Sequence, residues 1–270
     1  MRRLLFAAAL ALAPLAAANG QDRMPIREFD LPTTEALGAA ILRQDAAAWV
    51  ATDALRAKTP DLAGSGLVGW IVVDGGASQK VRFLRQRDGR LEAAYDIEVT
   101  ADLKATVTEP SERALPAHEL AMFTARQTAI AGMAGQPVCR AGYNTAVVKD
   151  PEQPGWLVWL LAPTPEVGAI PFGGHYRFTV SADGRTVTRR DALSASCAVM
   201  PKPDPSKDDV AAAFITHIVS PTPIETHVFL QLQSRRPLLI GAGEHMWSIV
   251  DGRIKDHGLL KDLAAQSKKK

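Results

Sequence analysis

The stretch Gly155-Trp156-Leu157-Val158-Trp159-Leu160-Leu161 is apolar at every position after its glycine. A strand with one face in water alternates between apolar and polar residues, whereas this run is apolar on both faces. It therefore predicts a central strand that is covered on each side by other parts of the chain.

The next predicted strand, Gly174–Val180, alternates instead. Because successive side chains of a strand point to opposite faces, we expect one face in the core and a polar face that carries His175 and Arg177. The turn Ser181-Ala182-Asp183-Gly184 would join it to a strand at Thr186–Arg190. Further short strands are expected in this half, at Tyr143–Val148, Phe214–Val219, Thr226–Gln233, Leu238–Ile240 and Met246–Val250.

The N-terminal half begins with a predicted helix, capped by Thr33 or Thr34 and with Glu35 in its first turn. Asp88-Gly89, a hairpin turn signal, joins the last two of three extended runs that follow. Those runs are Leu67–Val73, Lys80–Arg87 and Leu91–Thr100.

A second helix should start near Pro116, whose fixed φ suits the first helical position. Its predicted apolar face has three members, and Gly132 and Gly135 would end it. The members are Leu120, Phe123 and Ile130.

These elements predict an α+β fold with a mostly antiparallel sheet, two helices in the N-terminal half and a β-rich C-terminal half. We place a helix-plus-meander part at residues 21–135, an antiparallel β-rich part at 136–260 and a basic tail at 261–270. A single merged sheet is the alternative to two separate parts.

Residues 1–20 have the features of a secretory signal peptide, with a basic start at Arg2-Arg3, the apolar run Leu4–Ala18 and a small-residue exit. Cleavage is expected after Ala18 or after Gly20. A membrane anchor needs ~20 spanning residues, which neither this run nor any later one supplies. We therefore expect an exported, soluble protein that is periplasmic or secreted.

The net charge argues against nucleic acid as a partner. The 31 basic residues become 29 when Arg2 and Arg3 leave with the signal peptide, and they then balance the 29 acidic residues. Three of the basic residues that remain are Lys268–Lys270, so the folded body lacks the basic field that a nucleic-acid backbone requires. The expected partner is an unknown protein or small molecule in the periplasm.

The chain has two cysteines, Cys139 and Cys197, and both lie beyond the signal peptide. In an oxidising compartment such a pair predicts one disulfide. No CxxC motif is present, so a structural role is favoured over a redox role.

Partial matches to known catalytic motifs lack the neighbouring residues or elements that those motifs require. Gly64-Ser65-Gly66-Leu67-Val68-Gly69 matches GxGxxG, but a strand follows the glycines where the dinucleotide fingerprint needs a helix. His118-Glu119 begins like a zinc-protease helix, but Met122 stands where the second histidine is required. There is no GxSxG nucleophile elbow. We predict no metal and no other cofactor.

A looser polar set remains in the β-rich half, made of His175, His217, Glu225 and His227. Imidazole ligates metals and titrates near neutral pH, so such a set is suited to zinc binding or acid–base chemistry. The alternative is that each histidine hydrogen-bonds locally, and His217, between apolar neighbours, is expected to be buried. The candidate ligand-binding face consists of His175, Arg177, Glu225 and His227.

The chain resembles a group of exported bacterial proteins of unassigned function, through Gly173-Gly174-His175-Tyr176-Arg177-Phe178 with its Ser181–Gly184 turn, and through Pro221-Thr222-Pro223-Ile224-Glu225-Thr226-His227-Val228-Phe229-Leu230. The resemblance implies export and brings no catalytic residue, cofactor or substrate.

Since no catalytic motif is assembled, we expect a non-enzymatic binding or accessory module. One alternative is a PepSY-like interaction or inhibitory domain in the N-terminal half. The other is a metal-dependent or acid–base hydrolase that uses His175, His217, Glu225 and His227.

Overall fold

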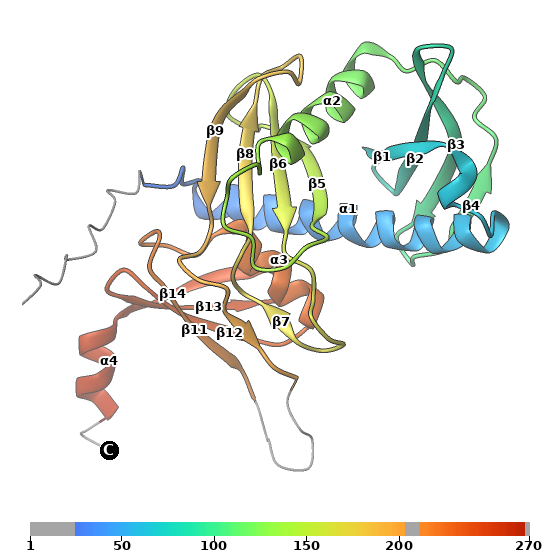
Figure 1. The fold of residues 1–270 in the computed structure, drawn as a ribbon. Helices are drawn as coiled ribbons and strands as arrows, with labels where there is room; N and C mark the ends of the chain where they lie inside the picture. Colours follow the sequence, from blue (N-terminus) through green and yellow to red (C-terminus); the bar gives the residue numbers. More distant parts are fainter. Residues whose placement is uncertain (1–24, 203–210, 268–270) are drawn as a thin grey trace, which may run out of the picture.

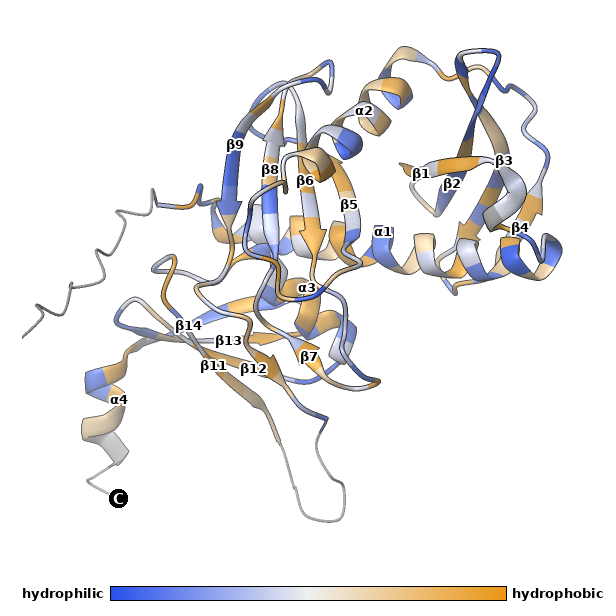
Figure 2. Ribbon diagram, in the orientation of Figure 1, coloured by the Kyte–Doolittle hydropathy of each residue, from blue (hydrophilic) through white to orange (hydrophobic). Residues whose placement is uncertain are grey.

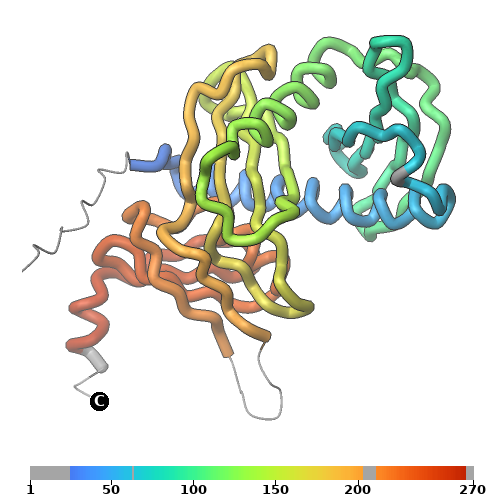
Figure 3. The backbone as a smooth tube through the Cα atoms, viewed as in Figure 1, coloured from blue at the N-terminus to red at the C-terminus, as the bar shows by residue number. Residues whose placement is uncertain are grey.

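The computed structural model describes residues 25–202 and 211–267. The predicted signal peptide and Lys268–Lys270 lie outside the described residues. Helix α1 (Leu31–Lys58) is the long element of the fold, and it runs past two sheets that pack on different parts of its length (Figures 1 and 3).

Helix α1 begins directly after Asp30, whose carboxylate accepts a hydrogen bond from the backbone N–H of Thr33 at 2.8 Å. Aspartate is among the best N-cap residues, and Pro32 suits the first helical turn. The predicted cap at Thr33 or Thr34 is therefore wrong by one turn, since a better acceptor precedes the proline.

The first sheet is an antiparallel meander whose strands lie in chain order. Asp88 and Gly89 form the expected tight turn with φ of 49° and 73°, as a type I′ hairpin requires. The sheet packs against the C-terminal half of α1, where alanines allow a close approach. Its strands are β1 (Leu67–Asp74), β2 (Ser78–Arg87), β3 (Arg90–Thr100) and β4 (Ala105–Thr108).

Helix α2 (Ala117–Ala131) starts after Pro116 and ends at Gly132, close to the predicted limits. Its predicted apolar face is wrong, because Leu120 and Ile130 are 45% and 41% exposed. The helix lies between two sheets and buries Phe123 against the first sheet and small residues, Ala125 and Ala129, against the second.

The second sheet is antiparallel with the order β5-β6-β8-β9. Every residue of β6 is buried, which confirms the prediction of a central strand covered on both sides. Helix α2 covers one face, α1 and α3 (Glu225–Ser234) cover the other, and the edge strand β9 is mainly hydrophilic (Figure 2). The strands are β5 (Asn144–Lys149), β6 (Trp156–Leu161), β8 (Tyr176–Val180) and β9 (Val187–Ala192).

The predicted disulfide between Cys139 and Cys197 is confirmed, with Cα atoms 5.5 Å apart. It joins the loop after α2 to the loop after β9. A short antiparallel pair is formed by β7 (Ile170–Pro171) and β10 (Val199–Met200), and β10 follows Cys197 closely in the sequence.

The third sheet follows in the C-terminal region, with the order β11-β12-β13-β14. The pair β11 and β12 is parallel and the other pairs are antiparallel. Helix α4 (Leu260–Ser267) then occupies most of the segment predicted as a tail at 261–270, which is therefore helical as far as Ser267. The strands are β11 (Ala213–His217), β12 (Leu238–Ala242), β13 (His245–Val250) and β14 (Arg253–Leu259).

The predicted strand Thr226–Gln233 is wrong, because these residues form helix α3. Its residues from Glu225 to Gln231 are all buried, and a short run that is buried on all sides has no periodicity to separate a helix from a strand. The helix start is stabilised by His227, whose Nδ1 accepts a hydrogen bond from the backbone N–H of Ile224 at 3.2 Å.

The prediction of an α+β fold with a β-rich C-terminal half is confirmed. Among the helices of residues 25–202 and 211–267, none combines the length and the apolar composition that a membrane span needs.

Candidate functional site

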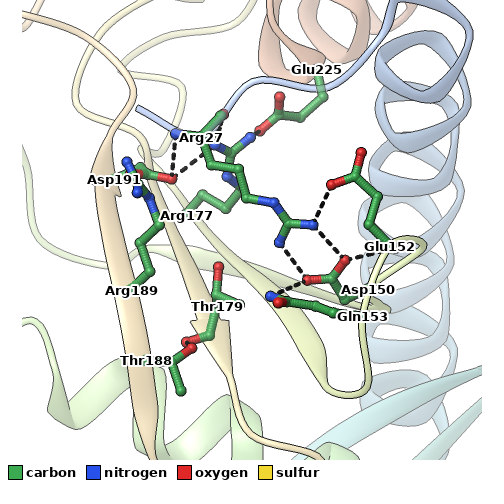
Figure 4. Close-up of polar contacts among 10 residues, drawn as sticks. All are labelled: Arg27, Asp150, Glu152, Gln153, Arg177, Thr179, Thr188, Arg189, Asp191 and Glu225. Atoms are coloured by element: carbon green, nitrogen blue, oxygen red, sulfur yellow. Dashed lines mark hydrogen bonds and ion pairs between the residues drawn. The ribbon is translucent and has the colours of Figure 1, made fainter. Parts of the chain in front are cut away.

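Arg177, on β8, lies at the centre of a buried ion-pair network (Figure 4). Its guanidinium donates to Glu225 Oε1 at 2.7 Å, to Asp191 Oδ2 at 2.8 Å and to the carbonyl oxygen of Arg27. Arg177 and Glu225 are each only 1% exposed. The prediction that these polar residues form an exposed face is therefore wrong, because α3 and the N-terminal segment cover that side of the sheet.

The same network fastens the segment before α1 to the second sheet. The guanidinium of Arg27 pairs with Asp150 at 2.5 Å and with Glu152 at 2.6 Å. Trp159 of β6 donates its indole N–H to Glu225 Oε1 at 2.9 Å. Polar and apolar residues do alternate in Gly174–Val180, but the polar side chains His175 and Arg177 form hydrogen bonds inside the protein.

His175 and His227 are also buried, at 1% and 2% exposed, and each hydrogen-bonds locally. The Nδ1 of His175 accepts from the backbone N–H of Ala162 at 3.0 Å, and its Nε2 faces the carbonyl oxygen of Pro171 at 2.6 Å. Burial lowers the pKa of His175 to about 4. The pKa of His227 lies well below its usual range because of burial, with further lowering by the nearby rings of His217 and His175.

His217, expected to be buried, is buried and lies against His227 with their ring centroids 4.5 Å apart. Its Nε2 is 2.8 Å from Ser220 Oγ, whose own hydroxyl donates to the carbonyl of Thr222 at 2.7 Å. The imidazole must then donate to the serine, whereas a general base would have to accept its proton. Burial lowers the pKa of His217 to about 4. Within residues 25–202 and 211–267, no group of three or more His, Cys, Asp or Glu side chains is placed to hold a metal.

A cleft of about 1500 Å³ lies along α1, where the first and second sheets face each other, and the C-terminal end of α3 reaches its rim. Large apolar side chains that line it are open to solvent, among them Trp49, which is 67% exposed, with Val68 and Leu103. Exposed apolar side chains gathered in a concave region are typical of ligand-binding sites.

One wall of the cleft carries a buried arginine, Arg126 of α2, which is 8% exposed. Its Nε donates to Thr145 Oγ1 at 2.8 Å, and its guanidinium lies over the ring of Trp70, 4.3 Å from the centroid. No carboxylate pairs with it among the described residues. Burial lowers the pKa of Arg126 to about 10.

Gly69 provides the space for this guanidinium. Its φ is +148°, and a Cβ there would come within 3.0 Å of Arg126 Nη1 and of the Phe123 ring. A larger residue would therefore displace Arg126.

A second charged group in the cleft is Asp45 of α1. Burial raises the pKa of its carboxyl to about 6, although a hydrogen bond with Asn144 acts in the opposite direction. Gln233 of α3 donates to it at 3.4 Å. The cleft therefore holds a buried cation and a carboxyl that do not pair with each other.

Arg126, Asp45 and Trp70 were not predicted as site residues from the sequence, although all three lie on correctly predicted elements. One signal was available, since Arg126 lies between Phe123 and Ala129 on the buried stripe of an amphipathic helix, where a charge is costly. The cleft itself depends on how three distant segments approach one another.

A comparison of the chain with protein-family models, with curated proteins and with solved structures finds no match. The resemblance to exported bacterial proteins therefore stays a prediction, and the site is interpreted from its own geometry.

Proposed function

We propose that this chain is an exported, non-enzymatic binding module whose ligand occupies the cleft along α1. Export is supported by residues 1–20 and by the disulfide between Cys139 and Cys197, which suits an oxidising compartment. The hydrolase and PepSY-like alternatives stay open, and no observation favours either of them.

The cleft carries the proposal. Ligand pockets usually measure about 300–1,000 Å³ and combine an apolar lining with a few polar groups. This cleft, at about 1500 Å³, exceeds that range and has such a lining, with Trp49 exposed inside it and Arg126 in its wall. A ligand that covers the apolar wall would remove this surface from water, which stabilises the complex.

The test is binding of Nile red, a neutral apolar dye, to the purified mature protein. Ala46→Trp fills the cleft from α1 and should weaken dye binding about tenfold or more, since a tryptophan occupies the ligand's volume. Ala131→Trp, exposed at the end of α2 and outside the cleft, is the matched control and should bind as the parent does. Dye binding that survives Ala46→Trp, or no binding at all, would contradict the proposal.

Intact mass of the same exported material tests its processing. We expect a chain that starts at Asn19 or Gln21. Retention of residues 1–20 on a membrane-bound species would contradict export as a soluble protein.

A further inference from the structure

We propose that the cleft selects ligands with one carboxylate on an apolar body, and that Arg126 binds this carboxylate. The inference rests on the proposed function, because it assigns a ligand class to the same cleft.

Arg126 has hydrogen-bonding capacity that the described part of the chain does not use. A guanidinium has five N–H donors, and here one is used by Thr145 and one by a long contact of 3.4 Å to Gln127. The others have no protein acceptor in the described part of the chain. A carboxylate supplies two acceptors that match this planar fork.

Arg126 is also a buried positive charge with no carboxylate partner among the described residues. Burying a cation without a counter-ion is costly, and the lowered pKa of Arg126 reflects that cost. Arg177 has the same chemistry and a similar depth, but Glu225 and Asp191 neutralise it. The missing anion at Arg126 is therefore supplied from outside the chain.

The guanidinium of Arg126 is, in addition, held in place before a ligand arrives. The face of Trp70 fixes its plane, Thr145 fixes its Nε edge, and Gly69 leaves room for it. An oriented donor set loses little conformational freedom on binding, which favours affinity.

The charges and the apolar lining of the cleft also indicate how many negative charges the ligand carries and that the rest of the ligand is apolar. Exposed arginines on the rim, Arg43 and Arg235, attract an anion over a distance. One buried cation neutralises one negative charge, and Asp45 becomes a second negative charge above about pH 6. A monocarboxylate matches the single charge of Arg126, whereas a dianionic phosphate would add one more negative charge that Arg126 does not neutralise. The apolar body then covers Trp49 and its neighbours.

The test compares ligands that differ only in the charged group, in two matched pairs. Decanoate is compared with 1-decanol, and an acetylated hydrophobic tripeptide with its C-terminal amide, so the pairs separate an acyl chain from a peptide terminus. Binding is measured by calorimetry and by the fluorescence of the cleft tryptophans, at about pH 7.5. At least one pair should have an apolar part that fits the cleft. In that pair, the carboxylate ligand should bind about tenfold or more tightly than its neutral counterpart, as expected of a charge-assisted hydrogen bond.

Arg126→Met retains much of the side-chain length and removes the charge. It should bring the two members of the pair within about twofold while leaving the affinity of the neutral ligand unchanged. Arg43→Met, an exposed rim arginine, removes the same charge and should keep most of the preference, since exposed charges are screened by solvent and salt. The wild-type comparison needs no variant, so the test stands even if Arg126→Met does not fold.

Equal affinities for carboxylate and neutral ligand in the wild type would overturn the inference, and Nile red binding would still support the cleft as a site. A preference that survives in Arg126→Met would also overturn it, because the carboxylate would then bind elsewhere. If neither pair binds to a cleft that takes up Nile red, the ligand class is wrong. If Nile red fails as well, the proposed function itself fails.

Discussion

Two buried arginines of this protein show how the partner decides the role of a residue. Arg177 donates to two buried carboxylates and a backbone carbonyl, so its contribution is to hold β8, α3 and the N-terminal segment together. Arg126 has a tryptophan face and a threonine hydroxyl but no carboxylate among the described residues. The charge of Arg177 is therefore neutralised within the chain, whereas the charge of Arg126 has no counter-ion among the described residues.

Arg177→Met should destabilise the protein by about 3–5 kcal/mol, because it leaves Glu225 buried without its cation and leaves Asp191 with only the partly exposed Arg189. Arg253→Met is the matched control. Arg253 also pairs with a carboxylate, Glu35, but its side chain is 82% exposed and the change should cost about 1 kcal/mol or less. Urea unfolding measures both, and an Arg177→Met protein as stable as the control would show that the network is not structural.

At the scale of elements, the sequence predicted what depends on local pattern. Strand β6 and the Asp88-Gly89 hairpin were found because burial on both faces and a positive-φ turn each leave a signature. Helix α3 was not recognised because Glu225–Gln231, which make up most of it, are covered on every side. The polar residues of β8 were assigned to a surface because their partners come from α3 and from residues before α1, which alternation along one strand does not reveal.

The cleft could not be predicted for a related reason. Its cation, its carboxyl and its aromatic wall come from α2, α1 and β1, and only the packing of these elements brings them to one place. An arginine on a buried helical stripe was a usable hint, but it does not distinguish an internal ion pair from an open site.

The crossing of α1 and α3 depends on one glycine. A Cβ at Gly38 would lie 2.5 Å from the Cβ of Val228 and 2.8 Å from the carbonyl oxygen of Glu225. Gly38→Ala must therefore push the two helices apart, and we expect a loss of about 1–3 kcal/mol in spite of the better helix propensity of alanine.

Gly241→Ala is the control for that substitution, since its new methyl would meet its nearest atoms at 3.8 Å and 3.9 Å, which is ordinary contact. Thermal unfolding of both variants measures the difference. Gly38→Ala with an unchanged Tm would mean that the two helices approach less closely than described.

At the scale of the whole molecule, α1 connects the two walls of the cleft. Its N-terminal half packs against α3 and the second sheet, where Leu37 and Ile41 enter the large core. Its C-terminal half packs against the meander through Ala51 and Leu55. The predicted boundary near residue 135 stays a prediction, but any division of the chain there leaves α1 in contact with both parts. A ligand in the cleft would therefore contact elements that pack on the same helix.

The stability of the molecule should fall as the pH drops below about 6.5, and the buried histidines determine the direction. The pKa values of His175 and His217 are about 4, against an ordinary 6.5, so the unfolded chain binds protons that the folded protein excludes. Their contribution is present above pH 6.5 and is lost as the pH approaches 4, and His227 acts in the same direction. The raised pKa of Asp45, about 6, opposes this by penalising the folded state when the carboxyl ionises. Three histidines outweigh one carboxyl below about pH 6.

Urea unfolding at intervals between about pH 7.5 and pH 4.5 measures this dependence. His217→Gln should reduce the slope by up to about one proton, or ~1.4 kcal/mol per pH unit, because the variant has no imidazole to protonate on unfolding. His118→Gln, which replaces an exposed histidine on α2, is the matched control and should leave the slope as it is in the parent. Asp45→Asn should raise the stability at pH 7.5 by about 1–3 kcal/mol, and this gain should shrink towards pH 4.5, where the carboxyl of the folded parent is protonated. If the stability of the parent protein stays constant or increases as the pH is lowered from 6.5 to 4.5, these histidines are accessible to protons in the folded state. The buried positions described for them would then be wrong.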